Sequence, residues 1–203
     1  MSEFWNERYS ESQYAYGEQP NSWFREQINK IEPGKILLPG DGEGRNGVYA
    51  AVKGWTVESF DLSHSGKAKA LQLAQQHGVQ INYSVGNLAH LHYSENYFDV
   101  LALLYTHFQP GMRTIFHQKL ANYLKPGGLV LIEGFSKNQI RRVSEKGAGG
   151  GPNNIDMLYS VEELRSDFSS FDIRLSREIC VHLNEGAYHK GESDVVRFVA
   201  VKL

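Results

Sequence analysis

Cysteine is almost absent from this sequence, since Cys180 is the only one among 203 residues. A single thiol cannot form an internal disulfide, and it cannot build a cysteine metal site. We interpret Cys180 as a buried thiol in a strand. The eight histidines show neither the ligand spacing nor the neighbouring carboxylates that a bound cation needs, so no metal site is predicted.

Basic stripes and long apolar runs are also missing. The 21 Lys and Arg residues are scattered and are offset by 23 Asp and Glu, which gives a net charge of -2 and argues against a nucleic-acid partner. No apolar run approaches the length needed to span a bilayer, and segment 1–8 contains acids where a secretion signal would be apolar. We therefore expect a cytoplasmic protein with no membrane contact and a small-molecule ligand. The sequence does not indicate an oligomeric state.

Strand-like apolar segments alternate with helical patterns through most of the chain. The expected strands are 35–39, 56–60, 80–85, 98–105 and 128–135. The expected helices are 67–77, closed by Gly78; 111–124, stopped by Pro126; and a short one to about Phe168, opened by a capping box at Ser160. This alternation predicts a parallel sheet with helical connections.

The last part of the chain departs from this alternation. Two β-rich segments, 171–182 and 194–202, are separated by about ten residues, which is too few for a helical crossover, so they should pair antiparallel. Because 203 residues with 41% apolar content can bury one sizeable core, we expect a single domain covering 1–203. The predicted fold class is α/β: a doubly wound, Rossmann-like mixed sheet, mostly parallel, with a C-terminal antiparallel hairpin.

A glycine-rich loop follows the first predicted strand. Gly40, Gly42 and Gly44 alternate with other residues, and a helix-like segment begins directly after them. Glycine lacks a Cβ atom, so the backbone can adopt positive φ and approach a ligand closely, while the helix start offers unpaired N–H groups. The loop therefore suggests a nucleotide site, although the glycines alone also fit an ordinary turn.

An acid ends the second predicted strand. Asp61 lies about twenty residues after the glycine loop, at the position where a carboxylate in a doubly wound fold accepts hydrogen bonds from both ribose hydroxyls. The competing interpretation is that Asp61 caps the helix beginning near His64. The spacing favours the nucleotide interpretation.

Taken together, these motifs resemble the class I S-adenosylmethionine-dependent methyltransferases over nearly the whole chain. The resemblance includes the glycine loop, Asp61, the Leu-Lys-Pro-Gly-Gly segment 124–128 and the terminal hairpin. The chain is most similar to the tellurite-resistance and thiopurine methyltransferase-like group, through segments 42–46, 16–21 and 185–189. This implies S-adenosyl-L-methionine as the cofactor and methyl transfer to a small-molecule acceptor, with a thiol or a chalcogen oxyanion favoured.

The candidate site residues lie beyond the carboxyl ends of the predicted strands, where open α/β sheets bind their ligands. For the cofactor we expect Gly40, Asp41, Gly42 and Gly44 at the methionine part, Asp61 and Leu62 at the ribose, Asn87 and Leu88 at the adenine, and Tyr105 at the methyl group. Candidate catalytic residues are His107 and His189, and Arg45, Glu185 and Arg197 are candidate substrate-binding residues.

Two positions depart from the resemblance. Leu38 stands where the family usually has an acid before the loop, and Glu43 is a candidate replacement. Asn87 stands where many relatives have Asp, and its carbonyl can still accept a hydrogen bond from the adenine. Two alternatives stay open: an NAD(P)-dependent oxidoreductase, because 42–47 also fits Gly-x-Gly-x-x-Gly, and a non-catalytic S-adenosylmethionine-binding module.

Two segments are predicted to cover the site. Residues 1–24 are rich in aromatic side chains, of which Tyr14 and Tyr16 are expected to act as a lid, while Trp23 and Phe24 fit a helix that packs on the sheet. The glycine-rich segment 144–154 is expected to be a flexible loop that could lie over the site.

Overall fold

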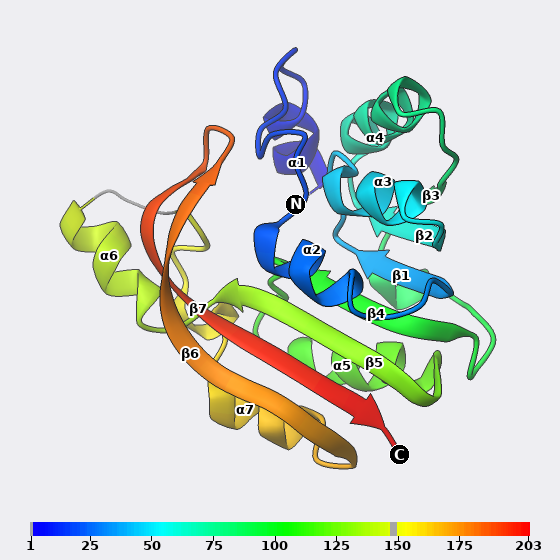
Figure 1. The fold of residues 1–203 in the computed structure, drawn as a ribbon. Helices are drawn as coiled ribbons and strands as arrows, with labels where there is room; N and C mark the ends of the chain where they lie inside the picture. Colours follow the sequence, from blue (N-terminus) through cyan, green and yellow to red (C-terminus); the bar gives the residue numbers. More distant parts are fainter. Residues whose placement is uncertain (1, 147–149) are drawn as a thin grey trace.

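The computed structural model describes residues 2–146 and 150–203, and its core is a mixed β-sheet (Figure 1). In this part of the chain the sheet has seven strands in the order β3-β2-β1-β4-β5-β7-β6. The strands are β1 Lys35–Pro39, β2 Thr56–Asp61, β3 Asn82–Val85, β4 Phe98–Leu104, β5 Leu124–Phe135, β6 Phe171–Glu185 and β7 His189–Lys202. Strands β1 to β5 pair in parallel, and β7 pairs antiparallel with both β5 and β6. The predicted fold class is confirmed.

Helices cover both faces of the sheet. They are α1 Ser2–Arg8, α2 Ser22–Ile28, α3 Arg45–Val52, α4 His64–Gln76, α5 Arg113–Asn122, α6 Gln139–Lys146 and α7 Val161–Asp167, with short 3-10 turns η1 Leu88–His90 and η2 Ile155–Met157. Ile36 and Leu38 of β1 pack in one cluster with α2, α3 and α4, whereas Leu37 packs in the other with α5 and α7. Successive strand residues thus point to opposite cores, as a doubly wound sheet requires.

Local sequence signals set several helix ends, and those at Gly78 and Ser160 are the predicted ones. The Ser63 hydroxyl accepts a hydrogen bond from the Gly66 N–H at the start of α4, and Gly78, with φ of +66°, follows its end. The Ser160 hydroxyl accepts from the Glu163 N–H at the start of α7. These three signals fix the limits of helices that connect or cover the strands.

The start of β5 differs from the prediction. Helix α5 ends at Asn122 and β5 already begins at Leu124, so Pro126 lies inside the strand rather than in a turn before it. The pairing register of β4 with β5 shifts between Phe98 and Val100, next to the proline. A proline lacks the N–H that a regular ladder would use, and it is tolerated at such an irregularity.

The C-terminal hairpin is longer and tighter than predicted. Strands β6 and β7 pair from Phe171↔Lys202 to Glu185↔His189, with one register shift between Ile173 and Leu175, so residues 186–188 alone form the turn. Figure 1 shows the hairpin bending away from the sheet so that its tip rises beside α1. Cys180 lies on the outer strand β6 and is exposed, so the prediction of a buried thiol is wrong.

The predicted loop 144–154 is partly helical. Residues up to Lys146 belong to α6, and residues 150–154 lead into η2. Positions 147–149 lie outside the described residues. Of the predicted loop, therefore, only part is irregular chain.

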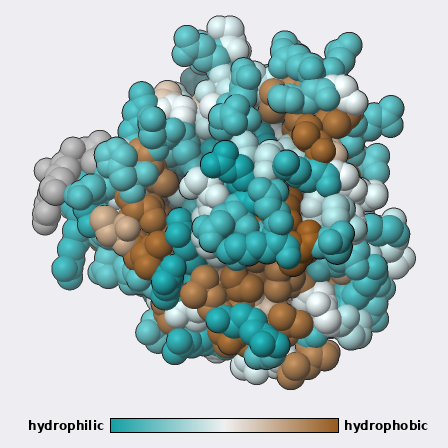
Figure 2. All heavy atoms as spheres, in the orientation of Figure 1, coloured by the Kyte–Doolittle hydropathy of each residue, from teal (hydrophilic) through white to brown (hydrophobic). Residues whose placement is uncertain are grey.

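The surface seen in Figure 2 is mostly hydrophilic, with apolar side chains gathered where Figure 1 places β5, β7 and β6. Among the described residues, no helix has both the length and the apolar character that crossing a membrane would take.

Candidate active site

A cavity of about 580 Å³ lies at the carboxyl ends of the parallel strands. Its volume falls within the range of about 300–1,000 Å³ that small-molecule sites occupy. We call one end the glycine-loop end; it is lined by Gly40, Asp41, Gly42, Asp61, Leu62, Asn87 and Leu88. We call the other the hairpin end; it is lined by Tyr16, Tyr105, His107, Phe135, Gly150, Gly151, Pro152, Met157, Tyr188 and His189.

The glycines of the loop are required by its geometry. Gly40, Gly42 and Gly44 all have positive φ, at +72°, +58° and +84°. A Cβ atom on Gly40 would lie 2.7 Å from the Thr106 hydroxyl, and one on Gly44 would lie 2.5 Å from the Ala70 Cβ. Gly44 is thus needed for the close packing of α3 against α4. Contrary to the expectation that it holds the cofactor, it does not line the cavity.

Asp41 lines the cavity, but its carboxylate is bound within the protein. Its Oδ2 accepts from the Ser59 hydroxyl at 2.7 Å, and its Oδ1 accepts from the Gly47 N–H at 3.3 Å. No cation pairs with it among the described residues, and burial raises its pKa to about 7. Asp41 therefore orders the loop against β2 and α3, rather than offering a free charge.

Asp61 occupies the expected position beside the loop. Its Oδ2 accepts from the Gly42 N–H at 3.1 Å and its Oδ1 from the Ser63 N–H at 2.9 Å, while the side chain lines the cavity. Since Ser63, not Asp61, is the N-cap of α4, the capping interpretation of Asp61 is wrong. Each carboxylate oxygen can accept a second hydrogen bond, which leaves room for ligand hydroxyls.

Leu62, Asn87 and Leu88 complete this end of the cavity. The Asn87 side-chain oxygen already accepts from the Ala89 N–H at 2.9 Å, in η1. It can still accept one hydrogen bond from a ligand, in agreement with the expected adenine contact.

The departure at Leu38 leaves the cavity open. Leu38 is 2% exposed and packs in the core beneath α2 and α3, so it does not line or block the cavity. Glu43, the candidate replacement acid, accepts from the Ala15 N–H at 2.8 Å and forms an ion pair with Lys69. Glu43 thus holds the N-terminal segment in place.

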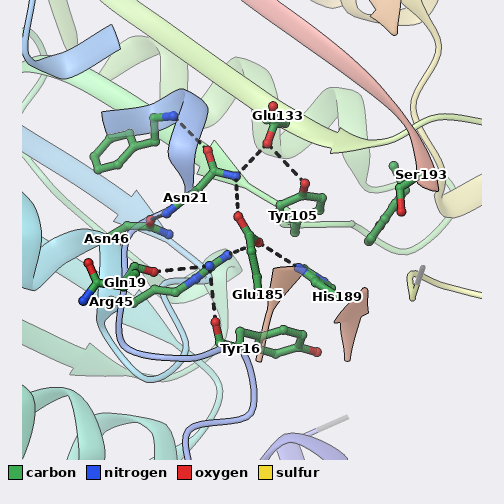
Figure 3. A network of polar contacts seen from close by, with 12 residues as sticks. Tyr16, Gln19, Asn21, Arg45, Asn46, Tyr105, Glu133, Glu185, His189 and Ser193 are labelled. Atoms are coloured by element: carbon green, nitrogen blue, oxygen red, sulfur yellow. Dashed lines mark hydrogen bonds and ion pairs between the residues drawn. The ribbon is translucent and has the colours of Figure 1, made fainter. Parts of the chain in front are cut away.

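A histidine with a carboxylate partner lies at the hairpin end (Figure 3). His189 begins β7 and is 5% exposed, and its Nδ1 lies 3.2 Å from Glu185 Oε2, four residues earlier across the turn. The same carboxylate oxygen accepts from Arg45 Nη2 at 2.8 Å. Because Glu185 accepts and does not donate, the histidine Nδ1 carries the proton, and the Nε2 lone pair has no partner among the described residues.

Near pH 7, the surroundings favour a neutral His189 and an ionised Glu185. Burial lowers the pKa of His189, so its imidazole is neutral near pH 7. Burial by itself would raise the pKa of Glu185, but the hydrogen bond with His189 and the charge of Arg45 lower it to about 2. A neutral imidazole oriented by a carboxylate is the arrangement of a general base.

Aromatic rings surround His189. The rings of Tyr16 and Tyr105 each lie 4.4 Å from it, centroid to centroid, and Phe135 lies at 5.2 Å. Tyr105 has φ of +56°, an uncommon conformation for a residue with a side chain, and its hydroxyl donates to Glu133 at 3.2 Å. Such an outlier persists only where the surroundings hold it in place.

Glu133 is a buried junction behind the cavity. It is 1% exposed and accepts from Asn21 Nδ2 at 2.6 Å, from Tyr105 and from Arg197 Nε. Arg197 and Glu185 do not themselves line the cavity. The structure therefore does not place them to bind a substrate directly. Arg197 neutralises the charge of Glu133, and Glu185 orients His189. Of the three candidate substrate-binding residues, Arg45 lines the cavity.

His107 lines the cavity, but both of its ring nitrogens are occupied. Nδ1 lies 3.0 Å from the Met157 carbonyl, and Nε2 accepts from the Phe135 N–H at 3.3 Å. Burial lowers the pKa of His107 to about 4. With no free lone pair, His107 is not placed to act as a base, which corrects the expectation of a catalytic role.

The N-terminal segment, residues 14–21, lies over the hairpin end. The Ala187 N–H donates to the Ala15 carbonyl at 2.8 Å, which joins this segment to the hairpin turn. Tyr16 lines the cavity, whereas Tyr14 packs beside α4 and donates to the Lys69 carbonyl. The lid position is therefore found for Tyr16 and not for Tyr14, while Trp23 and Phe24 are buried in α2 as predicted.

Several lining residues were not singled out from the sequence. Gly150, Gly151, Pro152 and Met157 line the hairpin end, and Arg8 of α1 lines the cavity between this end and the glycine loop. The two glycines and Pro152 belong to the segment expected to lie over the site, although no single residue of it is a predicted contact, and Arg8 lies in a helix that the sequence does not predict. The only sequence signal for Arg8 is its position next to the aromatic residues of segment 1–24.

Comparisons with known proteins agree with the geometry. Residues 36–128 match the model of a family described as a methyltransferase domain, which confirms the predicted enzyme class. No curated protein matches the chain in sequence.

Solved structures share the fold. A protein studied for the conversion of a disulfide bond into a thioacetal group in echinomycin biosynthesis has a TM-score of 0.79 at 17% identity, covering 100% of this chain and 93% of its own. TehB from Haemophilus influenzae has a TM-score of 0.72 at 16% identity, covering 100% and 67%. Magnesium protoporphyrin IX methyltransferase from Synechocystis, solved with bound S-adenosylhomocysteine, has a TM-score of 0.68 at 18% identity, covering 90% and 81%.

Proposed function

We propose that this protein transfers a methyl group from S-adenosylmethionine to a small-molecule acceptor, with a thiol as the favoured nucleophile. The observation that carries the proposal is that one cavity joins the glycine loop and Asp61 to the free Nε2 atom of His189. The methyltransferase-domain match over residues 36–128 supports the reaction class, and the fold shared with an S-adenosylhomocysteine-bound methyltransferase supports the donor.

The residues divide the work between the two ends of the cavity. At the glycine-loop end, Asp61 accepts hydrogen bonds from the ribose, and the backbone around Gly40 and Gly42 holds the methionine part. The bound donor supplies an electrophilic methyl group on a sulfonium. The sulfonium charge disappears during transfer, so alignment in a dry cleft provides much of the rate.

The acceptor is activated at the hairpin end. His189 Nε2 takes the proton of a thiol, the thiolate sulfur forms a bond to the methyl carbon, and the bond from that carbon to the donor sulfur breaks. Glu185 stabilises the imidazolium that results, through the hydrogen bond to Nδ1. A chalcogen oxyanion, the other acceptor that the resemblance favours, already carries its negative charge and has no need of such a base.

Membership of the tellurite-resistance and thiopurine methyltransferase-like group is part of the proposal. Its support is that two of the segments on which the resemblance rests, 16–21 and 185–189, lie against each other at the hairpin end. The Tyr16 ring lies 4.4 Å from the His189 ring, centroid to centroid, and Gly17 lies against Gly186. We also propose that the partner is a small molecule, with no nucleic acid or membrane involved.

The test is titration calorimetry with S-adenosylmethionine, S-adenosylhomocysteine and NADH in parallel, followed by turnover assays on thiols and chalcogen oxyanions. We expect the two adenosyl compounds to bind, NADH not to bind, and S-adenosylhomocysteine to be released with thiols. Binding of NADH in place of the adenosyl compounds would contradict the proposal. Adenosyl binding without turnover on any acceptor would favour a non-catalytic binding module.

A further inference from the structure

Arg8 is a cation on the cavity wall with unused hydrogen-bond donors. It ends α1 and is half-buried, and its guanidinium lies 3.7 Å from the centroid of the Tyr188 ring. One of its nitrogens, Nη1, donates to the Tyr16 hydroxyl at 3.2 Å. A guanidinium has five N–H donors, and no carboxylate of the described residues lies within ion-pair distance of Arg8.

The other cation on the cavity wall is already committed. Arg45 Nη2 pairs with Glu185, and its Nη1 is directed at the carbonyls of Tyr16 and Gln19 at 3.3 and 3.4 Å. Arg8 and Arg45 are the arginine and lysine residues that the described structure places on the cavity wall, and Arg8 is the one of them that is not paired with a carboxylate.

The position of Arg8 is fixed by its neighbours. Its guanidinium lies over two rings, those of Tyr188 and Phe4, and stacking of this kind restricts a long side chain. The next residue, Tyr9, lies against Gly42: a Cβ on that glycine would lie 2.7 Å from the Tyr9 hydroxyl. The end of α1 therefore holds a preorganised cation above the loop that is proposed to hold the methionine part.

We propose that Arg8 binds the carboxylate of the amino-acid part of the cofactor. This rests on the proposed function, since it takes S-adenosylmethionine as the methyl donor. Planar guanidinium groups pair with carboxylates through two parallel hydrogen bonds, and Arg8 has the free donors for this. This pairing would bind the amino-acid end of the cofactor through a charged group. Neither of the other candidate positions supplies one, because Leu38 stands where the family usually has an acid and Glu43 is paired with Lys69.

The experiment compares two ligands that differ at the amino-acid end. S-adenosylhomocysteine carries the carboxylate, whereas 5′-deoxy-5′-methylthioadenosine keeps the adenosine and the sulfur but lacks it. Titration calorimetry of Arg8→Gln should show a 10- to 100-fold rise in the Kd of S-adenosylhomocysteine, on the order of a lost charge-assisted hydrogen bond. The Kd of methylthioadenosine should stay within about twofold of the wild type, because that ligand has no carboxylate to lose.

Two further variants sharpen the result. Arg8→Lys keeps the charge without the planar fork and should restore part of the affinity for S-adenosylhomocysteine. Arg174→Gln changes an arginine that pairs with Asp172 on the outer strand β6, away from the cavity, and should leave both constants unchanged.

Each outcome has a distinct meaning. An unchanged Kd for S-adenosylhomocysteine in Arg8→Gln, or an equal loss for both ligands, would overturn the carboxylate contact. If the wild-type protein bound neither ligand, the proposed function itself would fail, whatever the role of Arg8.

Discussion

The two ends of the cavity are built in different ways. The glycine-loop end is made by residues that follow β1, β2 and β3, and the Gly42 N–H donates to the Asp61 carboxylate there. The hairpin end is made by side chains brought together from β4, β5, β7 and the N-terminal segment, as in the contact of Tyr16 with His189. The first is a general cradle formed by local sequence, and the second depends on the whole fold.

The buried acids of the two ends show the same contrast. Asp41 accepts from a hydroxyl and an N–H but forms no ion pair among the described residues, and burial raises its pKa to about 7. The side chain of Glu185 is 13% exposed, and although burial opposes its charge, His189 and Arg45 bring its pKa down to about 2. Burial alone therefore does not decide the charge of an acid; the neighbouring donors do.

The largest effect is expected at His189. His189→Ala should lower kcat by roughly 10²- to 10³-fold, because the acceptor loses its base. In the wild type, kcat/KM should fall as the pH drops through the pKa of His189, which burial places below its usual value of 6.5. Steady-state kinetics across the pH range would measure both.

The matched control is His182→Ala, which removes an exposed histidine of β6 and should leave kcat unchanged. Calorimetry with S-adenosylhomocysteine would show that His189→Ala still folds and binds. If His189→Ala kept wild-type turnover, the hairpin end would not supply the base.

The next effect is expected at the glycine-loop end. Asp61→Ala should weaken binding of S-adenosylhomocysteine by about 1.5–3 kcal/mol, because hydrogen bonds between the ribose and a charged acceptor are lost. Calorimetry measures this directly. Ser63→Ala is the control: it removes the N-cap of α4, which costs about 1 kcal/mol of stability, but no proposed ligand contact. Equal losses of affinity in both variants would assign Asp61 a structural role alone.

Asp41 and Glu185 should respond to pH in opposite directions. The pKa of Glu185 is lowered, so its contribution to the free energy of unfolding is present above about pH 4.5 and is lost as the pH falls toward 2. The pKa of Asp41 is raised, so its contribution is present below about pH 3.8 and is lost as the pH rises through about 7.

At pH 8, therefore, Glu185→Gln should destabilise the protein and Asp41→Asn should stabilise it, each by about 1–3 kcal/mol relative to the wild type. Denaturant unfolding at several pH values would measure both. Shifts of the same sign at pH 8 would show that the two ends do not differ in the proposed way.

The smallest effect is expected at Tyr16, which belongs to the segment over the cavity. Tyr16→Ala should raise the Kd for S-adenosylmethionine several-fold, because the ring no longer covers the site or helps to exclude water. Tyr14→Ala, on a ring outside the cavity, is the control and should bind like the wild type. Unchanged calorimetry for Tyr16→Ala would exclude a lid role.

The sequence predicted the glycine-loop end better than the hairpin end, for a physical reason. The conformations of Gly40 and Gly42 and the position of Asp61 follow from local steric rules and from the βαβ connection. The free nitrogen of His189 and the occupied nitrogens of His107 follow from contacts with residues far along the chain, such as Met157. Two histidines that look equivalent in sequence thus differ because tertiary hydrogen bonds differ.

The fold shows the same limit. Strand alternation predicts the parallel sheet, but it predicts a shorter β6 and β7 than the structure has, because the polar residues around Gly186 are typical of a longer loop. The polar residues that extend the hairpin have low strand propensity and pair only because the opposite strand is present.

The turn between β6 and β7 sets a strict requirement on chain length. Gly186 fits tightly against the N-terminal segment, and Glu185 and His189 are cross-strand partners closed by three residues. One inserted residue would shift the register, and a shift of one position turns a strand side chain to the opposite face of its sheet. Surface turns commonly vary in length between relatives, but this one should keep its spacing, so a Glu followed by His four positions later is a pattern by which proteins with the same chemistry could be sought.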